Sequence, residues 1–154
     1  MRRRRIVAIG SLVAIGLALA ALQLAIERET VREVEVANPD GGAGHALVLY
    51  HPGLSDLQEA LSDAFVAELV ERDWRVTRTT TSASAPSDVG AYDLLALGVH
   101  TYWWAPDGPT RRYLARVGDL GGTPVVVLLS ALGAAGRAEA RGAVFAGIFC
   151  PRQI

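Results

Sequence analysis

The sequence predicts an α/β protein built on an open parallel sheet, and two patterns lead to this fold class. Three runs, at residues 46–50, 93–97 and 125–129, have the length of strands and, apart from Asp93, are apolar without polar alternation. Strands that are apolar on both faces are typical of parallel sheets covered by helices on either side. An amphipathic helical pattern follows the first run, from about residue 56 to residue 72. This strand, its loop and the helix form a first βα unit.

The loop of this unit is where the sequence first indicates a ligand. Pro52 cannot continue a strand ladder and Gly53 permits a tight turn, so we expect a helix to begin near Leu54 or Ser55. The helix repeats apolar residues every four positions over roughly five turns. These residues are Leu57, Leu61, Phe65 and Leu69. Ser55 and Asp56 can cap the first amides, and a helix N-terminus favours a phosphate group.

The N-terminus contains a candidate membrane-spanning helix. Arginines at residues 2–5 precede residues 6–26, an uncharged run whose only polar members are Ser11 and Gln23. A helix of this length crosses a hydrocarbon layer of about 30 Å. A cleaved signal peptide is the alternative, because residues 18–20 have a small-x-small form, but the run continues beyond the usual h-region of about 7–15 residues. We therefore expect a single-pass membrane anchor in residues 1–26.

The charges on either side of the segment predict its orientation. Four arginines lie before it, whereas only Arg28 and Arg32 follow it closely. Because basic residues concentrate on the cytoplasmic side, we expect a cytoplasmic N-terminus and an extracytoplasmic domain. Residues 27–44 alternate Glu and Arg with Val and then become Gly-rich, which predicts a stalk and flexible linker. The folded domain is expected to occupy residues 45–154.

Composition argues against several function classes. The formal net charge is −1, from 15 basic and 16 acidic residues; beyond residues 2–5, 11 Arg face 16 acids, a net charge of −5. A basic nucleic-acid-binding surface is therefore not expected. Cys150 is the only cysteine, which excludes an intrachain disulfide and cysteine-based metal or redox motifs. His45, His51 and His100 lack ligand spacing and predict no metal site.

The rest of the domain continues the α/β pattern. Residues 74–79 alternate bulky residues with Arg, which predicts a strand at the edge of the sheet. The strand at residues 93–97 is expected to end at Gly98. The remaining predicted elements are a single helical turn at most within residues 80–92, a helix at residues 110–117 and a glycine-interrupted helical pattern at residues 137–149.

Two later loops have compositions suited to a planar ligand. Tyr102, Trp103 and Trp104 follow a predicted parallel strand, and open α/β sheets bind ligands at the carboxyl ends of their strands. Aromatic rings there can stack on a flat ligand, or they can simply cover the core. Residues 130–136, after the last apolar strand, are rich in Gly and Ala, which lets backbone amides approach a ligand closely.

Together, the first strand with its loop, residues 92–98 leading into the aromatic loop, and the small-residue loop after Ser130 resemble the flavodoxin-like superfamily over about residues 45–140. The resemblance implies the strand order 2-1-3-4 and flavin mononucleotide (FMN) bound non-covalently by three loops. The first loop would hold the phosphate, and the other two would flank the isoalloxazine ring. The cofactor-binding residues that it implies are His51, Pro52, Gly53, Leu54, Ser55, Asp56, Thr101, Tyr102, Trp103, Trp104, Ser130, Ala131, Gly133 and Gly136.

Two features depart from the family. His51, Pro52 and Leu54 stand where the family's phosphate loop is rich in Ser and Thr. The family's fifth strand is apparently missing, since no long strand is predicted after Gly136. A strand at residues 125–129 without a neighbour would expose an apolar edge, so oligomerisation is expected.

The resemblance implies a membrane-anchored FMN protein for electron transfer, either a carrier or an FMN-dependent oxidoreductase module, with an unknown redox partner. The alternative is a cofactor-free interaction module that keeps the fold but has lost FMN binding. A serine hydrolase is a more distant reading, because Ser55 and Ser130 each follow a strand but no G-x-S-x-G elbow is present.

Overall fold

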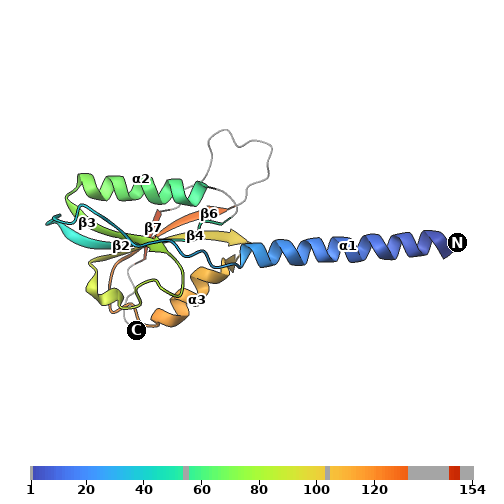
Figure 1. Cartoon of the computed structure of the whole chain (residues 1–154). Coiled ribbons are helices and arrows are strands. Elements are labelled where there is room, and N and C mark those ends of the chain that lie inside the picture. Colours follow the sequence, from blue (N-terminus) through green and yellow to red (C-terminus); the bar gives the residue numbers. More distant parts are fainter. Residues whose placement is uncertain (1, 54–55, 103–104, 132–145, 150–154) are drawn as a thin grey trace.

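The computed structural model describes residues 2–53, 56–102, 105–131 and 146–149. One long helix, α1 (Arg2–Ile26), projects from an α/β domain (Figure 1). The domain is built on a 7-stranded mixed sheet. The predicted α/β class is therefore confirmed, together with a single apolar helix at the N-terminus.

The sheet has a parallel centre with antiparallel strands around it. Its order is β1-β3-β2-β4-β6-β7, and β5 pairs with β4. The parallel strands are β2 (Gly44–Tyr50), β3 (Trp74–Thr80), β4 (Leu94–Tyr102) and β6 (Val125–Ala131). The antiparallel ones are β1 (Glu35–Ala37), β5 (Ala105–Pro106) and β7 (Ala146–Phe149). The four strands expected from the sequence are neighbours, but the expectation of a purely parallel sheet is wrong.

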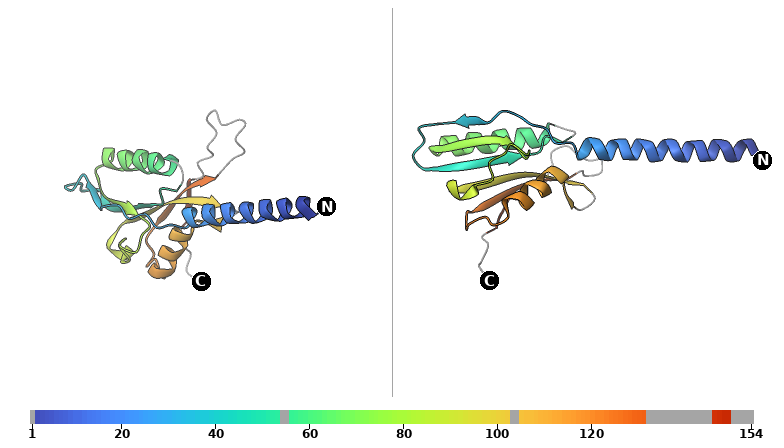
Figure 2. Two further views of the ribbon diagram at one scale, coloured as in Figure 1. Left: turned by 45° about the vertical axis from the view of Figure 1, so that its right-hand side comes forward. Right: turned by 60° about the horizontal axis from the view of Figure 1, so that its bottom comes forward.

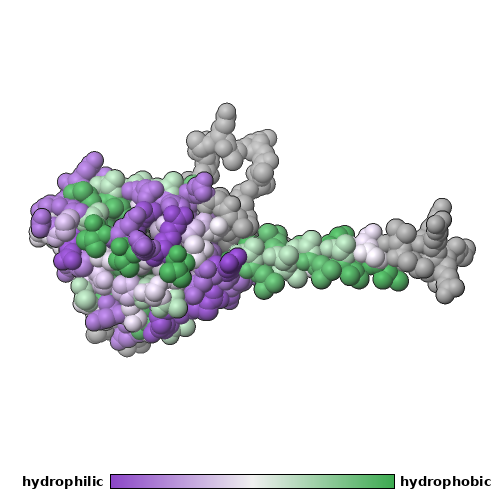
Figure 3. All heavy atoms as spheres, in the orientation of Figure 1, coloured by the Kyte–Doolittle hydropathy of each residue, from purple (hydrophilic) through white to green (hydrophobic). Residues whose placement is uncertain are grey.

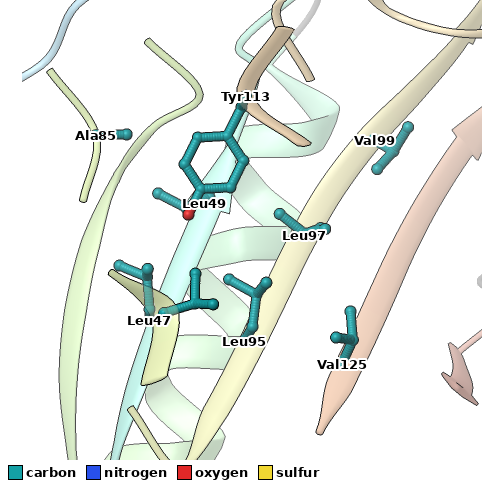
Figure 4. Close-up of a cluster of buried hydrophobic side chains, with 9 residues drawn as sticks. Leu47, Leu49, Ala85, Leu95, Leu97, Val99, Tyr113 and Val125 are labelled. Carbon is teal, nitrogen blue, oxygen red and sulfur yellow. The ribbon is translucent and has the colours of Figure 1, made fainter. Parts of the chain in front are cut away.

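Helices cover both faces of the sheet, which explains why its central strands are apolar throughout. The helices of the domain are α2 (Leu57–Glu71), α3 (Gly108–Val117) and the short 3-10 helix η1 (Val89–Ala91). On one face Leu69 of α2 packs with Val48 and Val76. On the other, Tyr113 of α3 packs with Leu49 and its neighbours (Figure 4).

The helix α1 is uncharged from Ile6 to its end and lies almost wholly outside the domain. Its window Ile9–Ile26 has a mean hydropathy of 2.3. Large apolar side chains such as Leu12 and Leu24 are 69% and 73% exposed. Figure 3 shows this continuous apolar surface beside the largely polar face of the domain. In length and composition, α1 can cross a membrane, as the sequence predicts.

Both edges of the parallel centre are covered, which corrects two expectations. The strand β3 is not an edge strand, because Glu35 and Ala37 of β1 pair with Arg78 and Val76. Part of the stretch expected as a stalk therefore belongs to the sheet. At the other edge β6 pairs with β7, so the expectation of a missing neighbour is wrong and the reason to expect oligomerisation is removed.

The strand β4 continues past Gly98 to Tyr102 before the chain turns back into β5. Much of the expected aromatic loop is therefore strand, whereas Trp103 and Trp104 lie outside the described residues. A helical pattern was expected at residues 137–149. Its described part, Ala146–Phe149, forms the strand β7 instead.

Candidate functional site

The carboxyl ends of β2, β4 and β6 meet at one edge of the sheet, since the three strands are parallel neighbours. We call this the carboxyl edge. The predicted cofactor residues that the structure places there are His51, Pro52, Gly53, Asp56, Thr101, Tyr102, Ser130 and Ala131. The remaining predicted residues, Leu54, Ser55, Trp103, Trp104, Gly133 and Gly136, lie outside the described residues.

The buried His100 connects all three strand ends. Its Nδ1 lies 2.8 Å from Oγ of Ser130, at the end of β6. Its ring meets the ring of His51 edge-on, with 6.2 Å between the ring centroids. A Cβ atom placed on Gly53 would lie only 2.4 Å from Nε2 of His100. Beside it, Thr101 Oγ1 donates a hydrogen bond of 3.2 Å to the carbonyl oxygen of Ser130.

Sequence reasoning missed this role of His100, because it expected the strand to end at Gly98. The signal was present in the residues after Gly98, since Val99, Thr101 and Tyr102 are β-branched or aromatic and favour a strand. A continuing strand would have placed His100 at the predicted ligand edge.

Burial lowers the pKa of His100 below its ordinary value of 6.5. A backbone hydrogen bond with Pro52 and the negative charge of Asp107 raise the pKa in part, and His51 acts in both directions, since its charge lowers the pKa and its backbone hydrogen bond raises it. The imidazole is therefore neutral at neutral pH, so it can exchange a hydrogen bond with the Ser130 hydroxyl without carrying charge.

We expect the domain to lose stability when the pH falls below about 6.5. A histidine whose pKa is lowered in the folded state binds fewer protons there than in the unfolded state, so its contribution is complete above the unfolded pKa and decreases below it. Thermal unfolding between about pH 7.5 and pH 5 measures this effect.

The replacement His100→Asn should make the stability of the domain depend less steeply on pH. The matched variant His45→Asn reports the separate share of His45, whose pKa is also lowered, chiefly by burial; a His100→Asn profile as steep as wild type would contradict the assignment.

The end of α1 is docked at the carboxyl edge. The buried ring of His51 donates a hydrogen bond from Nε2 to the carbonyl oxygen of Ile26, 3.2 Å away. Glu27 lies 3.6 Å from Arg111 and 3.4 Å from Arg112, and Arg112 also donates a 3.0 Å hydrogen bond to the Glu27 carbonyl oxygen. The first residue of the expected phosphate loop is thus hydrogen-bonded to the last residue of α1.

Asp107 fixes the start of α3 to the end of β4. Its carboxylate is 1% exposed and accepts hydrogen bonds from the backbone amides of His100 (3.1 Å) and Thr110 (2.8 Å). It is the N-cap residue of α3 and Pro109 follows in the first turn, as is favourable at a helix start. By contrast, Asp56 at the N-cap of α2 makes no side-chain capping bond, so the cap expected from Asp56 is absent, and Ser55 lies outside the described residues.

Most of the described residues of the expected FMN loops have partners within the chain itself. His51 and Gly53 pack against the chain itself, and the hydroxyl groups of Thr101 and Ser130 have internal partners. Of the predicted first loop, Asp56 is exposed at the start of α2, where backbone amides face out. A separate cavity of about 110 Å³ lies between residues 32–35 and β3. It is smaller than the roughly 300–1,000 Å³ of typical cofactor pockets.

Among the residues that the structure describes, no three His, Cys, Asp or Glu side chains are grouped to hold a metal ion. No protein-family model, no curated protein and no solved structure matches this chain. The site must therefore be interpreted from its own geometry.

Proposed function

We propose that this protein is a membrane-anchored, flavodoxin-like domain that binds FMN non-covalently at the carboxyl edge and transfers electrons. The observation that supports the proposal is the convergence of the predicted loops. Thr101 at the end of β4 and Ser130 at the end of β6 are joined by a hydrogen bond, and the chain between β2 and α2 lies at the same edge. Three loops at adjacent parallel strand ends are the arrangement in which open α/β sheets bind nucleotides.

Each loop has a separate part in the proposal. The first turn of α2, beginning after Asp56, would offer backbone amides to the FMN phosphate. Tyr102, Trp103 and Trp104 would flank the ring, and the chain after Ser130 would approach it through its backbone. FMN itself would supply the redox chemistry, and the protein would bind it, orient it and exclude water from it.

A cofactor-free interaction module is the second candidate, and one observation favours it. The described part of the first loop is turned toward the protein itself, with His51 bonded to Ile26 and Gly53 against His100. Such a domain would keep the fold and lose the phosphate site. Visible absorption of the full-length protein, purified in detergent and then titrated with FMN, separates the two. A flavin spectrum supports the first candidate, and no binding at saturating FMN supports the second.

Replacement of both Trp103 and Trp104 by Ala should weaken FMN binding by about tenfold or more. The loss combines a stacking contribution of about 0.5–1.5 kcal/mol with lost apolar burial. Quenching of flavin fluorescence measures the dissociation constant. The matched control is Trp74→Phe, because Trp74 begins β3 at the opposite end of the sheet. An unchanged dissociation constant in the double variant would remove the aromatic loop from the site.

We also propose that the N-terminus is cytoplasmic and the domain extracytoplasmic, because four arginines precede α1 and only Arg28 and Arg32 follow it closely. A reporter that fluoresces only in the cytoplasm, fused after Ile154, should stay dark. Replacing residues 2–5 with Ser removes the excess of positive charge before α1, so part of the fusion protein should then fluoresce. Bright cells with the native N-terminus would reverse the orientation.

A further inference from the structure

The domain begins where the membrane-spanning helix ends, without a spacer between them. The last residue of α1, Ile26, is 6% exposed and its carbonyl oxygen accepts the hydrogen bond of His51. The next residue, Glu27, is held by Arg111 and Arg112 near the start of α3. The chain is therefore bound to the carboxyl edge at the point where the apolar helix α1 ends.

The residues after Glu27 run back along the domain. The Arg32 amide donates a 3.2 Å hydrogen bond to Oγ1 of Thr80, and Oγ1 of Thr79 donates one of 3.3 Å to the Arg32 carbonyl oxygen. The Arg32 guanidinium pairs with Glu59 of α2 at 2.8 Å. The strand β1 then pairs with β3. Residues 27–37 are thus a strap fixed to the domain, and they do not hold it away from α1.

The direction of α1 follows from this docking. In Figure 1 and in both views of Figure 2, α1 leaves the domain from the end toward which the arrows of the parallel strands point. In the membrane-anchored protein proposed above, lipid surrounds the exposed large apolar side chains of α1 from Ile9 to Leu24. The carboxyl edge must then lie close to the lipid headgroups.

We propose that the carboxyl edge, with β5 and the first turn of α3, rests on the headgroup layer of the membrane that holds α1. The charges at this end suit such a surface. Arg28, Arg111 and Arg112 are exposed there, against the half-buried carboxylates of Glu27 and Glu29. Guanidinium groups at this depth can reach lipid phosphates.

This orientation limits what can reach the site. A molecule that binds at the carboxyl edge arrives through or along the headgroup layer, so the electron partner would be dissolved or embedded in the membrane. The statement about the electron partner rests on the proposed FMN function, whereas the orientation of the domain does not.

The test measures the depth of two positions in the full-length protein reconstituted into phospholipid vesicles. Single cysteines are introduced as Pro106→Cys at the carboxyl edge and Ser87→Cys at the opposite end, in a Cys150→Ser background; both replaced side chains are exposed. The strand β4 separates the two ends by roughly 25 Å. Each cysteine carries a fluorophore, and a nitroxide on the lipid headgroup serves as the quencher.

We expect the label at position 106 to be quenched at least about threefold more than the label at position 87, since the nitroxide acts only at short range and the labels are about a strand length apart. Equal quenching, or stronger quenching at position 87, would overturn the proposal. A flexible linker inserted between Ile26 and Glu27 should remove most of the contrast, and a contrast that survives unchanged would show that the docking does not set the orientation. A protein that shows the contrast but binds no FMN would support the orientation and reject the proposed electron transfer.

Discussion

Gly53→Ala should lower the free energy of unfolding by about 2–4 kcal/mol, the sum of two costs. Gly53 has φ +64°, where an L-residue with a Cβ atom is strained. The new Cβ would also lie 2.4 Å from Nε2 of His100 and 2.7 Å from its Cδ2. The imidazole cannot retreat easily, because it is buried and its Nδ1 is held by Ser130.

Urea unfolding of the detergent-solubilised protein measures this loss. The matched control is Gly121→Ala, because Gly121 has a similar φ of +61° but no atom within 4 Å of the added Cβ. It should lose only the conformational contribution, about 1 kcal/mol. The difference between the two variants isolates the contact with His100. Equal losses would mean that His100 does not pack against Gly53.

The central strands and α2 could be predicted because their signals are local. Unbroken apolar runs require cover on both faces, and α2 and α3 supply it for Val48 and Leu49, which are both fully buried. The period of four predicted the side of α2 that carries Phe65 and Leu69. It was wrong at the start of the helix, where Leu57 is 48% exposed and Gln58 is fully buried instead. Such patterns depend only on which residues, a few positions apart in the sequence, share one face of a strand or helix.

The length of β4 was missed although the residues after Gly98 favour a strand, because Gly98 was interpreted as a turn residue. The packing around position 98 requires a glycine instead. A Cβ there would lie 2.4 Å from Nε2 of Gln58 and 2.9 Å from Cβ of Tyr50. The buried Gln58 donates to the carbonyl oxygen of Leu128 across the sheet, 2.8 Å away. The need for a small residue at position 98 comes from Gln58 of α2 and its acceptor Leu128 in β6. Both lie outside any short stretch of sequence around Gly98.

The strap was missed for a similar reason. Its partners, Thr80, Glu59 and the strand β3, lie 27–48 residues away in sequence from Arg32. Alternating Glu, Arg and Val residues are equally compatible with a solvated stalk and with a short edge strand. The candidate site shows the same limit, since His51 and His100 are 49 positions apart and become neighbours only through the pairing of β2 with β4.

Asp107→Ala should also lower the free energy of unfolding by about 2–4 kcal/mol, since it removes a helix cap and a second buried acceptor. The Thr110 amide would lose its capping partner at the start of α3. The buried His100 amide would lose the Asp107 carboxylate as an acceptor. Nothing in the Ala side chain can replace either bond, and burial prevents water from doing so at no cost.

Two further variants decide whether the loss comes from these bonds, measured by urea unfolding in detergent. Asp107→Asn keeps the shape and one acceptor oxygen, so its loss should be about half as large, because its amide nitrogen would oppose one of the two donors. Asp88→Ala is the matched control, because Asp88 is also an N-cap residue, at η1, but makes no side-chain capping bond. It should change stability by less than about 0.5 kcal/mol. If Asp107→Ala were as mild as Asp88→Ala, the carboxylate would not join α3 to β4, and the positions of Arg111 and Arg112 against Glu27 would need another cause.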